Sequence, residues 1–139
     1  MNQNQLQILK LLEELPDSSD FELVPATSLQ ITVFKERAFT KKVPENVITQ
    51  LIELYKVADG YVNHMVIGFI NCDDETIFEW WGVYQELWIG QRDLNTLRWA
   101  NGTFCLGDAS STSYDESYES PTLVGLIEIC RNEMLRAID

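Results

Sequence analysis

The strongest constraint on how this chain can fold is the Asn101-Gly102 pair, which lies between two short runs of apolar and β-favouring residues. A type I′ turn needs positive φ at both central positions, and Asn and Gly tolerate that conformation best. The pair therefore predicts a two-residue hairpin in which Ala100 faces Thr103. Alternation then places one set of side chains toward a core: Leu97, Trp99, Phe104 and Leu106. The opposite face receives Arg98, Ala100, Thr103 and Cys105.

The stretch that follows the hairpin is the most distinctive surface segment that the sequence predicts. Gly107-Asp108 leads into Ser- and Thr-rich residues up to Ser120, with no basic residue among them, and we expect an exposed loop. Tyrosine rings mixed with carboxylates are typical of interface patches, although a solvated loop without a partner is the alternative. The candidate partner-binding residues are Asp108, Tyr114, Asp115, Glu116, Tyr118 and Glu119.

Length and composition indicate one domain spanning residues 1–139. The chain has 139 residues, of which 45% are hydrophobic, enough for one core and too few for two. No apolar run reaches membrane-spanning length and the polar start does not resemble a signal peptide, so a cytoplasmic location without membrane association is expected. The three cysteines, Cys72, Cys105 and Cys130, are widely spaced and are predicted to be buried free thiols rather than disulfides or metal ligands. No cofactor is expected.

The formal net charge of −12 restricts the kind of partner. Binding nucleic acid requires a basic stripe that displaces counterions from phosphates, and the sequence has none. A charged partner is therefore expected to be a basic protein. The alternative is that the acidic composition only keeps the protein in solution.

Periodicity predicts the remaining elements. Apolar residues at helical spacing predict a helix from Leu6 to Leu15, a proline-led helix over 44–58, and a last helix that starts at Pro121 and runs to Ile138. Alternating residues predict strands over 29–39 and 65–70, the first with a locally basic end that we interpret as solvated. His64, at the edge of the second strand, is expected to be an ordinary side chain. The fold class predicted is α+β, with a mostly antiparallel sheet and packed helices.

A further helix is predicted after the cap-like residues Asn71 to Asp74. Ile77, Phe78, Trp81, Tyr84 and Trp88 follow at helical spacing, and we interpret this aromatic stripe as core. Acidic side chains suit the positive end of a helix dipole, which gives a structural explanation for the acidic first turn. The same residues form a second candidate partner-binding group: Asp73, Asp74 and Glu75.

The order of these elements resembles the SUKH superfamily. VPENVITQLIELYKVADG is similar to the family's proline-led helix and its glycine turn, and CDDETIFEWWGVYQELW is similar to its "sleeileew" helix. The chain departs from the family in having one glycine after Asp59 and in the long SSTSYDESYES segment. The resemblance implies an α+β fold. The family's members include bacterial immunity proteins that neutralise toxins, and relatives of fungal regulators of glucan synthesis.

Three functions are compatible with these features. The first is a non-enzymatic immunity protein that binds a basic toxin, for which an acidic surface speeds association. The second is a regulatory or scaffold protein that uses the same surface. The third is a hydrolase or metal site built from Asp108, Asp115, Glu116 and Glu119, since paired carboxylates can act as acid, base or oxygen ligands.

Overall fold

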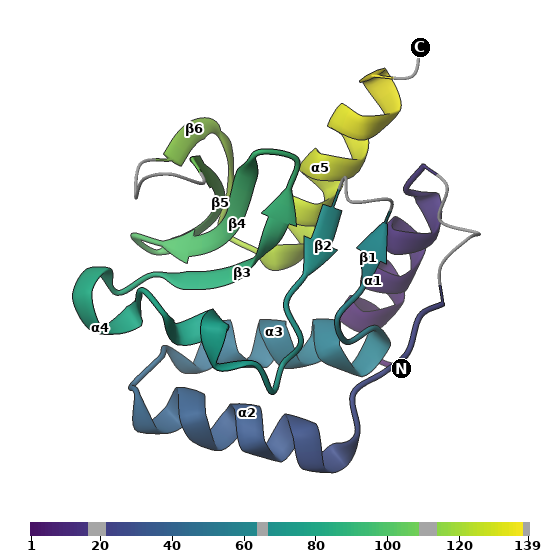
Figure 1. Ribbon diagram of the computed structural model, residues 1–139. Helices are drawn as coiled ribbons and strands as arrows, with labels where there is room; N and C mark the ends of the chain where they lie inside the picture. Colours follow the sequence, from purple (N-terminus) through teal and green to yellow (C-terminus); the bar gives the residue numbers. More distant parts are fainter. Residues whose placement is uncertain (17–21, 64–66, 109–113, 138–139) are drawn as a thin grey trace.

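The computed structural model describes residues 1–16, 22–63, 67–108 and 114–137 (Figure 1). The predicted position of His64 lies outside these ranges, as do the end of the last predicted helix at Ile138 and the centre of the predicted loop over 109–113. In the described ranges the helices are α1 (Gln3–Glu14), α2 (Ser28–Thr40), α3 (Glu45–Val57), the 3₁₀ helix η2 (Glu75–Phe78), α4 (Trp81–Tyr84) and α5 (Leu123–Ala137).

The strands of the described residues form one antiparallel sheet in the order β1-β2-β3-β4-β5-β6. Each strand therefore pairs with its neighbours in sequence, which short connections allow. Helices and sheet together confirm the predicted α+β class. The strands are β1 (Val62–Asn63), β2 (Ile67–Phe69), β3 (Leu87–Arg92), β4 (Asn95–Ala100), β5 (Thr103–Asp108) and β6 (Tyr114–Ser120).

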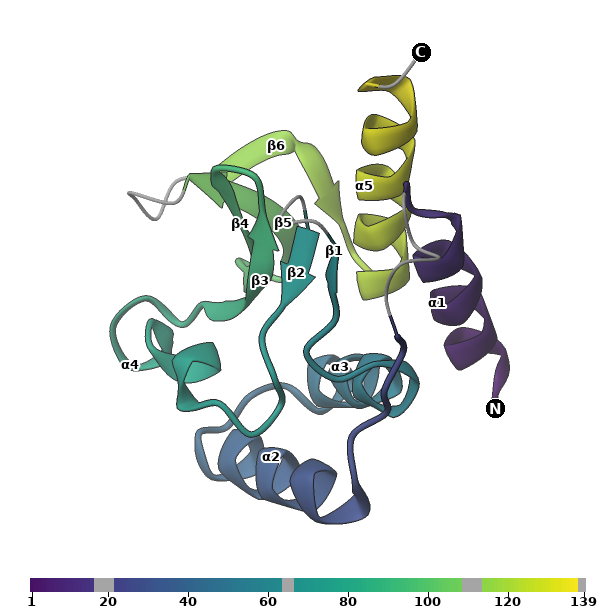
Figure 2. The same cartoon turned by 45° about the vertical axis from the view of Figure 1, so that its right-hand side comes forward.

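One hydrophobic core lies between the sheet and the helices. The helix α5 packs against β5, β6 and α1, while α1 also packs against α3, and α2 lies on the outer side of α3 (Figure 2). The sheet contributes Leu97, Phe104 and Leu106 to this core, each at most 2% exposed. The α5 stripe is buried as predicted at Leu123, Leu126, Ile127, Cys130 and Met134. All three cysteines are buried and free.

The predicted hairpin has the expected turn and register. Asn101 and Gly102 have φ of 53° and 82°, and Ala100 pairs with Thr103. Both faces of β4 are covered, because Arg98 on the second face is 0% exposed. The hairpin is thus a central part of the sheet with a polar side chain enclosed on its second face.

The predicted strand over 29–39 is wrong, since these residues form the helix α2. Thr27 caps the helix by accepting from the Gln30 backbone N–H, and the Gln30 side chain accepts from Thr27 in return. Such a capping box favours a helix even where β-branched residues follow. Phe34 and Ala38 are buried four residues apart, as helical geometry requires, whereas Leu29 is 73% exposed.

The predicted aromatic helix is interrupted. Asp74 does cap a helix, but that helix is the four-residue η2, and α4 adds only one further turn before Gln85 adopts a left-handed conformation at φ 56°. Trp88 therefore lies in β3 rather than on a helix. The chain gains strand pairing with β4 by this break, and the predicted continuous stripe is divided among η2, α4 and β3.

The predicted loop over 107–120 is also wrong at both ends, because Gly107 and Asp108 end β5 and residues 114–120 form β6. Phe104, Cys105, Leu106 and Gly107 pair with this strand, with an irregularity between Cys105 and Leu106. Without β6, the outer edge of β5 would be unpaired, and pairing satisfies its backbone groups despite the polar composition of the segment. Among the described residues no helix combines the length and apolar character needed to cross a membrane.

Candidate functional site

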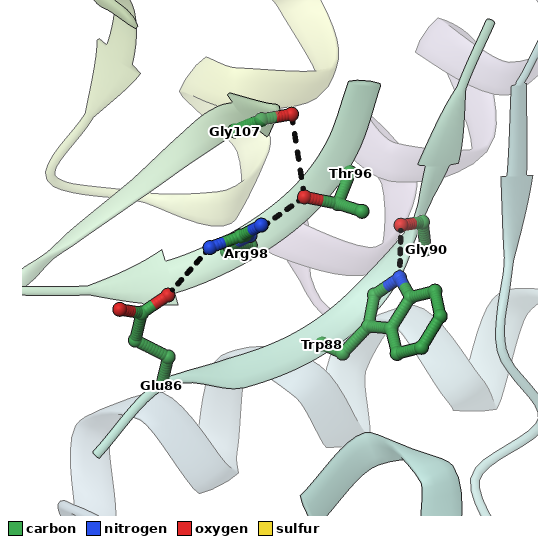
Figure 3. Close-up of polar contacts among 6 residues, drawn as sticks. All are labelled: Glu86, Trp88, Gly90, Thr96, Arg98 and Gly107. Atoms are coloured by element: carbon green, nitrogen blue, oxygen red, sulfur yellow. Dashed lines mark hydrogen bonds and ion pairs between the residues drawn. The ribbon is translucent and has the colours of Figure 1, made fainter. Parts of the chain in front are cut away.

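The second face of the sheet holds a buried polar network around Arg98 (Figure 3). The Arg98 Nη1 donates to Glu86 Oε1 at 2.8 Å, and its Nε donates to Thr96 Oγ1 at 2.6 Å. Thr96 in turn donates to the Gly107 carbonyl at 3.3 Å. Because a buried charge is tolerated only when paired and hydrogen-bonded, this network fixes the positions of β4, β5 and the start of β3 relative to one another.

Two tryptophans cover this network. The guanidinium carbon of Arg98 lies 4.3 Å from the centre of the Trp80 ring, a cation–π contact. The Trp80 and Trp88 rings are stacked with centres 4.6 Å apart and planes 9° apart. Trp88 is held in this position by donating its indole N–H to the Gly90 carbonyl at 2.9 Å (Figure 3).

The tryptophan pair continues into exposed apolar side chains at α4. Val83 and Tyr84 are 77% and 54% exposed, and they lie three and four residues after Trp80, on the same side of the helical turn. Trp81, by contrast, is buried and donates to the Lys41 carbonyl at 2.6 Å. Adjacent tryptophans therefore point to opposite sides, one to the core and one to the surface.

A row of cross-strand neighbours links this patch to one of the predicted acidic residues. Trp88 pairs with Arg98, Arg98 with Cys105, and Cys105 with Glu119, so the four side chains share one face of β3 to β6. Glu119 is exposed. We name the surface formed by Trp80, Val83, Tyr84, Trp88 and Glu119 the aromatic face.

The thiol on this row is not set up as a nucleophile. Burial raises the pKa of Cys105 to about 12, with smaller raising contributions from Glu86 and Glu119, although Arg98 acts in the opposite direction. A thiol is reactive as the thiolate, so Cys105 stays protonated and unreactive near neutral pH. The aromatic face therefore offers a partner its large rings and the Glu119 carboxylate, and no reactive thiol.

The predicted acidic segment is only partly described. Asp108 ends β5 and Tyr114, Asp115 and Glu116 begin β6, but their side chains lie outside the described part. Tyr118 is partly buried and packs against the core, which leaves part of its surface for a partner. Of this group, Glu119 is the residue whose described side chain is exposed on the aromatic face.

The second predicted acidic group lies elsewhere, beside α2 and after β2 (Figure 1). Asp73 accepts from the Gln30 side chain at 3.3 Å, and its backbone carbonyl accepts from Arg37 at 2.7 Å. Asp74 caps η2, and the hydrogen bonds from the Thr76 backbone and side chain lower the pKa of its carboxyl. Glu75 lies 3.7 Å from Arg37. These residues tie η2 to α2, and the structure does not bring them together with β6.

Sequence reasoning missed the stacking of Trp80 on Trp88, because it placed Trp88 in an aromatic stripe assigned to the core and assigned no position to Trp80. No sequence signal separates Trp80 from Trp81, because adjacent helical residues such as Leu126 and Ile127 can both be buried in one core. No local pattern in the sequence indicates that Arg98 is buried, because its partner Glu86 lies 12 residues away, in the connection before β3. Among the described residues, no cluster of three or more His, Cys, Asp or Glu is placed to hold a metal ion.

Comparison of the chain with protein-family models, with curated proteins and with solved structures finds no match.

Proposed function

We propose that this chain is a non-enzymatic protein-binding domain that neutralises a basic bacterial toxin, with the aromatic face as its docking surface. The observation that supports this function best is the stacked Trp80–Trp88 pair continuing into exposed Val83 and Tyr84. Trp and Tyr dominate binding energy at protein interfaces because they bury large areas at low entropy cost. The resemblance to SUKH immunity proteins points in the same direction.

The charge of the chain supports a basic partner. A net charge of −12 attracts cationic proteins at long range and accelerates their association. At short range, Lys or Arg side chains of the partner can stack on exposed rings, in the way that Arg98 already stacks on Trp80. Glu119 adds a carboxylate at the other end of the face.

The test is capture of a partner with this chain as bait, followed by a growth assay in which the captured protein is expressed alone and with this chain. We expect the captured protein to arrest growth alone and to be neutralised by the chain. Val83→Asp should weaken binding by at least about tenfold, as expected for a central contact. Leu29→Asp, which changes a similarly exposed side chain on α2, is the matched control.

Two results would contradict the proposal. Unchanged binding by the Val83→Asp variant would remove the aromatic face from the interface. Capture of a harmless cellular protein, without effect on growth, would favour the regulatory alternative over toxin neutralisation.

A further inference from the structure

A groove between α2 and α3 forms a second surface that shares no residue with the aromatic face. Its volume is about 830 Å³, within the range of sites that bind ligands or peptide side chains. Buried Val43 and Ile48 contribute to its lining together with the partly buried Ile52. Phe39, at the end of α2, is also part of the lining and is 79% exposed.

The length of the groove suits a segment of polypeptide. Glu45, Ile48, Ile52 and Lys56 lie on one face of α3, because they follow one another at three or four residues. At about 1.5 Å per residue, this face is about 17 Å long, equal to about three helical turns. The helices α2 and α3 that border the groove lie side by side beneath the sheet (Figures 1 and 2).

The charge around the groove is opposite to that of the whole chain. Three of the ten basic residues of the sequence line it, Lys35, Lys42 and Lys56, whereas only two of the 22 acidic residues do so. One of these two, Glu53, accepts two hydrogen bonds from the Asn2 side chain at 2.8 and 3.0 Å. None of the three lysines forms an ion pair with any other residue that the structure describes. Three ammonium groups are therefore available at the edge of an apolar surface.

We propose that this groove binds an amphipathic, acidic segment of a protein partner. Apolar side chains at helical spacing would pack on Phe39 and Ile52, and flanking carboxylates would reach the three lysines. Exposed apolar surface rimmed by charged side chains marks interaction sites, and a helix in a groove is a common recognition mode. The proposal is independent of the toxin-binding function, since it uses other residues and the opposite charge.

The probe is a synthetic peptide of about three helical turns with Leu at positions i, i+3, i+4 and i+7 and Glu at the remaining positions. It is titrated into the ¹⁵N-labelled full chain at about 0.15 M salt, where long-range repulsion by the net charge is screened. We expect the amide signals of Phe39, Ile52 and Lys56 to shift in a saturable way. A peptide with Lys in place of Glu should be attracted to other, acidic surfaces and should leave these signals unchanged.

Matched variants separate the apolar and the charged contributions. Phe39→Ala should weaken binding of the acidic peptide by about tenfold, whereas Leu29→Ala, on the same helix and outside the groove lining, should leave it unchanged. Lys35→Glu should weaken it severalfold, and Lys10→Glu, the same charge change on α1, should have no such effect. Each variant changes an exposed side chain, so the melting temperature should stay close to that of the parent.

Three outcomes would overturn the proposal. The first is the absence of shifts at the groove at millimolar acidic peptide. The second is equal binding of both peptides at the same residues, which would deny a role to the lysines. The third is saturable binding of oleate at Phe39 and Ile52 without binding of the peptide, which would assign the groove to a small anionic amphiphile instead.

Discussion

Arg98 and Glu86 form an ion pair with 2.8 Å between Nη1 and Oε1, and the Arg98 side chain is 0% exposed. The pair joins the connection before β3 to the middle of β4, on the sheet face opposite the apolar core. Trp80 covers the guanidinium. The surface on which we propose that a partner docks therefore depends on a buried charge pair beneath it.

Breaking this pair should be costly. Glu86→Gln removes the carboxylate that pairs with the buried Arg98 guanidinium, and we expect the free energy of unfolding in urea to fall by about 3–5 kcal/mol. The double variant Arg98→Met with Glu86→Met should recover part of this loss, because both buried charges are replaced by apolar side chains of similar volume. Glu133→Gln, which breaks the surface pair with Arg136, should cost no more than about 1 kcal/mol. Equal effects at the two glutamates would contradict the structural role of the buried pair.

The apolar face of the hairpin gives a second prediction. Leu106 is 2% exposed in the core, so Leu106→Asp places an unpaired charge there at a cost of several kcal/mol and should unfold the domain. Leu94→Asp makes the same change at a position that is 83% exposed and should melt like the parent. Thermal unfolding followed by circular dichroism compares the two. A Leu106→Asp variant that melted at the parent's temperature would show that Leu106 is not in the core.

The parts of the fold that could be predicted from the sequence are those whose local signals agree with their tertiary surroundings. Asn101-Gly102 fixes the turn, and that turn fixes the register of β4 and β5. The stripe of α5 and the proline-led α3 are similar cases. In α2, local signals conflicted: alternating β-branched residues indicated a strand, but the Thr27–Gln30 capping box indicated a helix, and the helix formed.

The candidate site could be predicted less well, because it depends on contacts between distant residues. The sequence predicts Glu119 as an exposed acidic residue but predicts its segment as a loop, because a polar edge strand has no local signature and forms only where β5 supplies its pairing partner. The stacking of Trp80 on Trp88 needs the chain reversal at Gln85, which has a left-handed φ without being a glycine. Only the three-dimensional arrangement shows that these side chains meet.

Gly90 gives a third prediction, because a Cβ at this position would lie 2.1 Å from the backbone oxygen of Gly68 on the neighbouring strand. Gly90→Ala should therefore separate β2 from β3 and lower the free energy of unfolding by about 1–3 kcal/mol. Gly82→Ala in α4 is the matched control, since no atom lies within 4 Å of its Cβ, and it should be neutral or stabilising by up to about 1 kcal/mol. Denaturant titration of both variants measures the difference. Gly90→Ala as stable as the parent would contradict the close packing of these strands.

The cysteines give a prediction about pH. Burial raises the pKa of Cys72 and Cys105 to about 12 and that of Cys130 to about 11, above the value of about 8.5 for a thiol in an unfolded chain. The unfolded state thus loses these protons first, so the contribution of the thiols to stability is complete below about pH 8.5 and is lost as the pH rises toward 12. At pH 8 the folded chain should react slowly with dithionitrobenzoate, and the unfolded chain rapidly at all three thiols. Rapid reaction of one thiol in the folded chain would contradict its burial.

The last prediction separates the two acidic groups, which the structure places at different sites. If the partner docks on the aromatic face, Glu119→Lys should slow its association severalfold at low salt, since it reverses a charge on that face, and the effect should shrink at high salt. Asp73→Lys makes the same charge change beside α2 and should alter the association rate much less, because this position lies away from the aromatic face and acts on it only through the net charge. Stopped-flow kinetics with the captured partner at two ionic strengths measures both rates. If Asp73→Lys has the larger effect, the docking surface lies at η2 and α2, and the aromatic rings at α4 need another explanation.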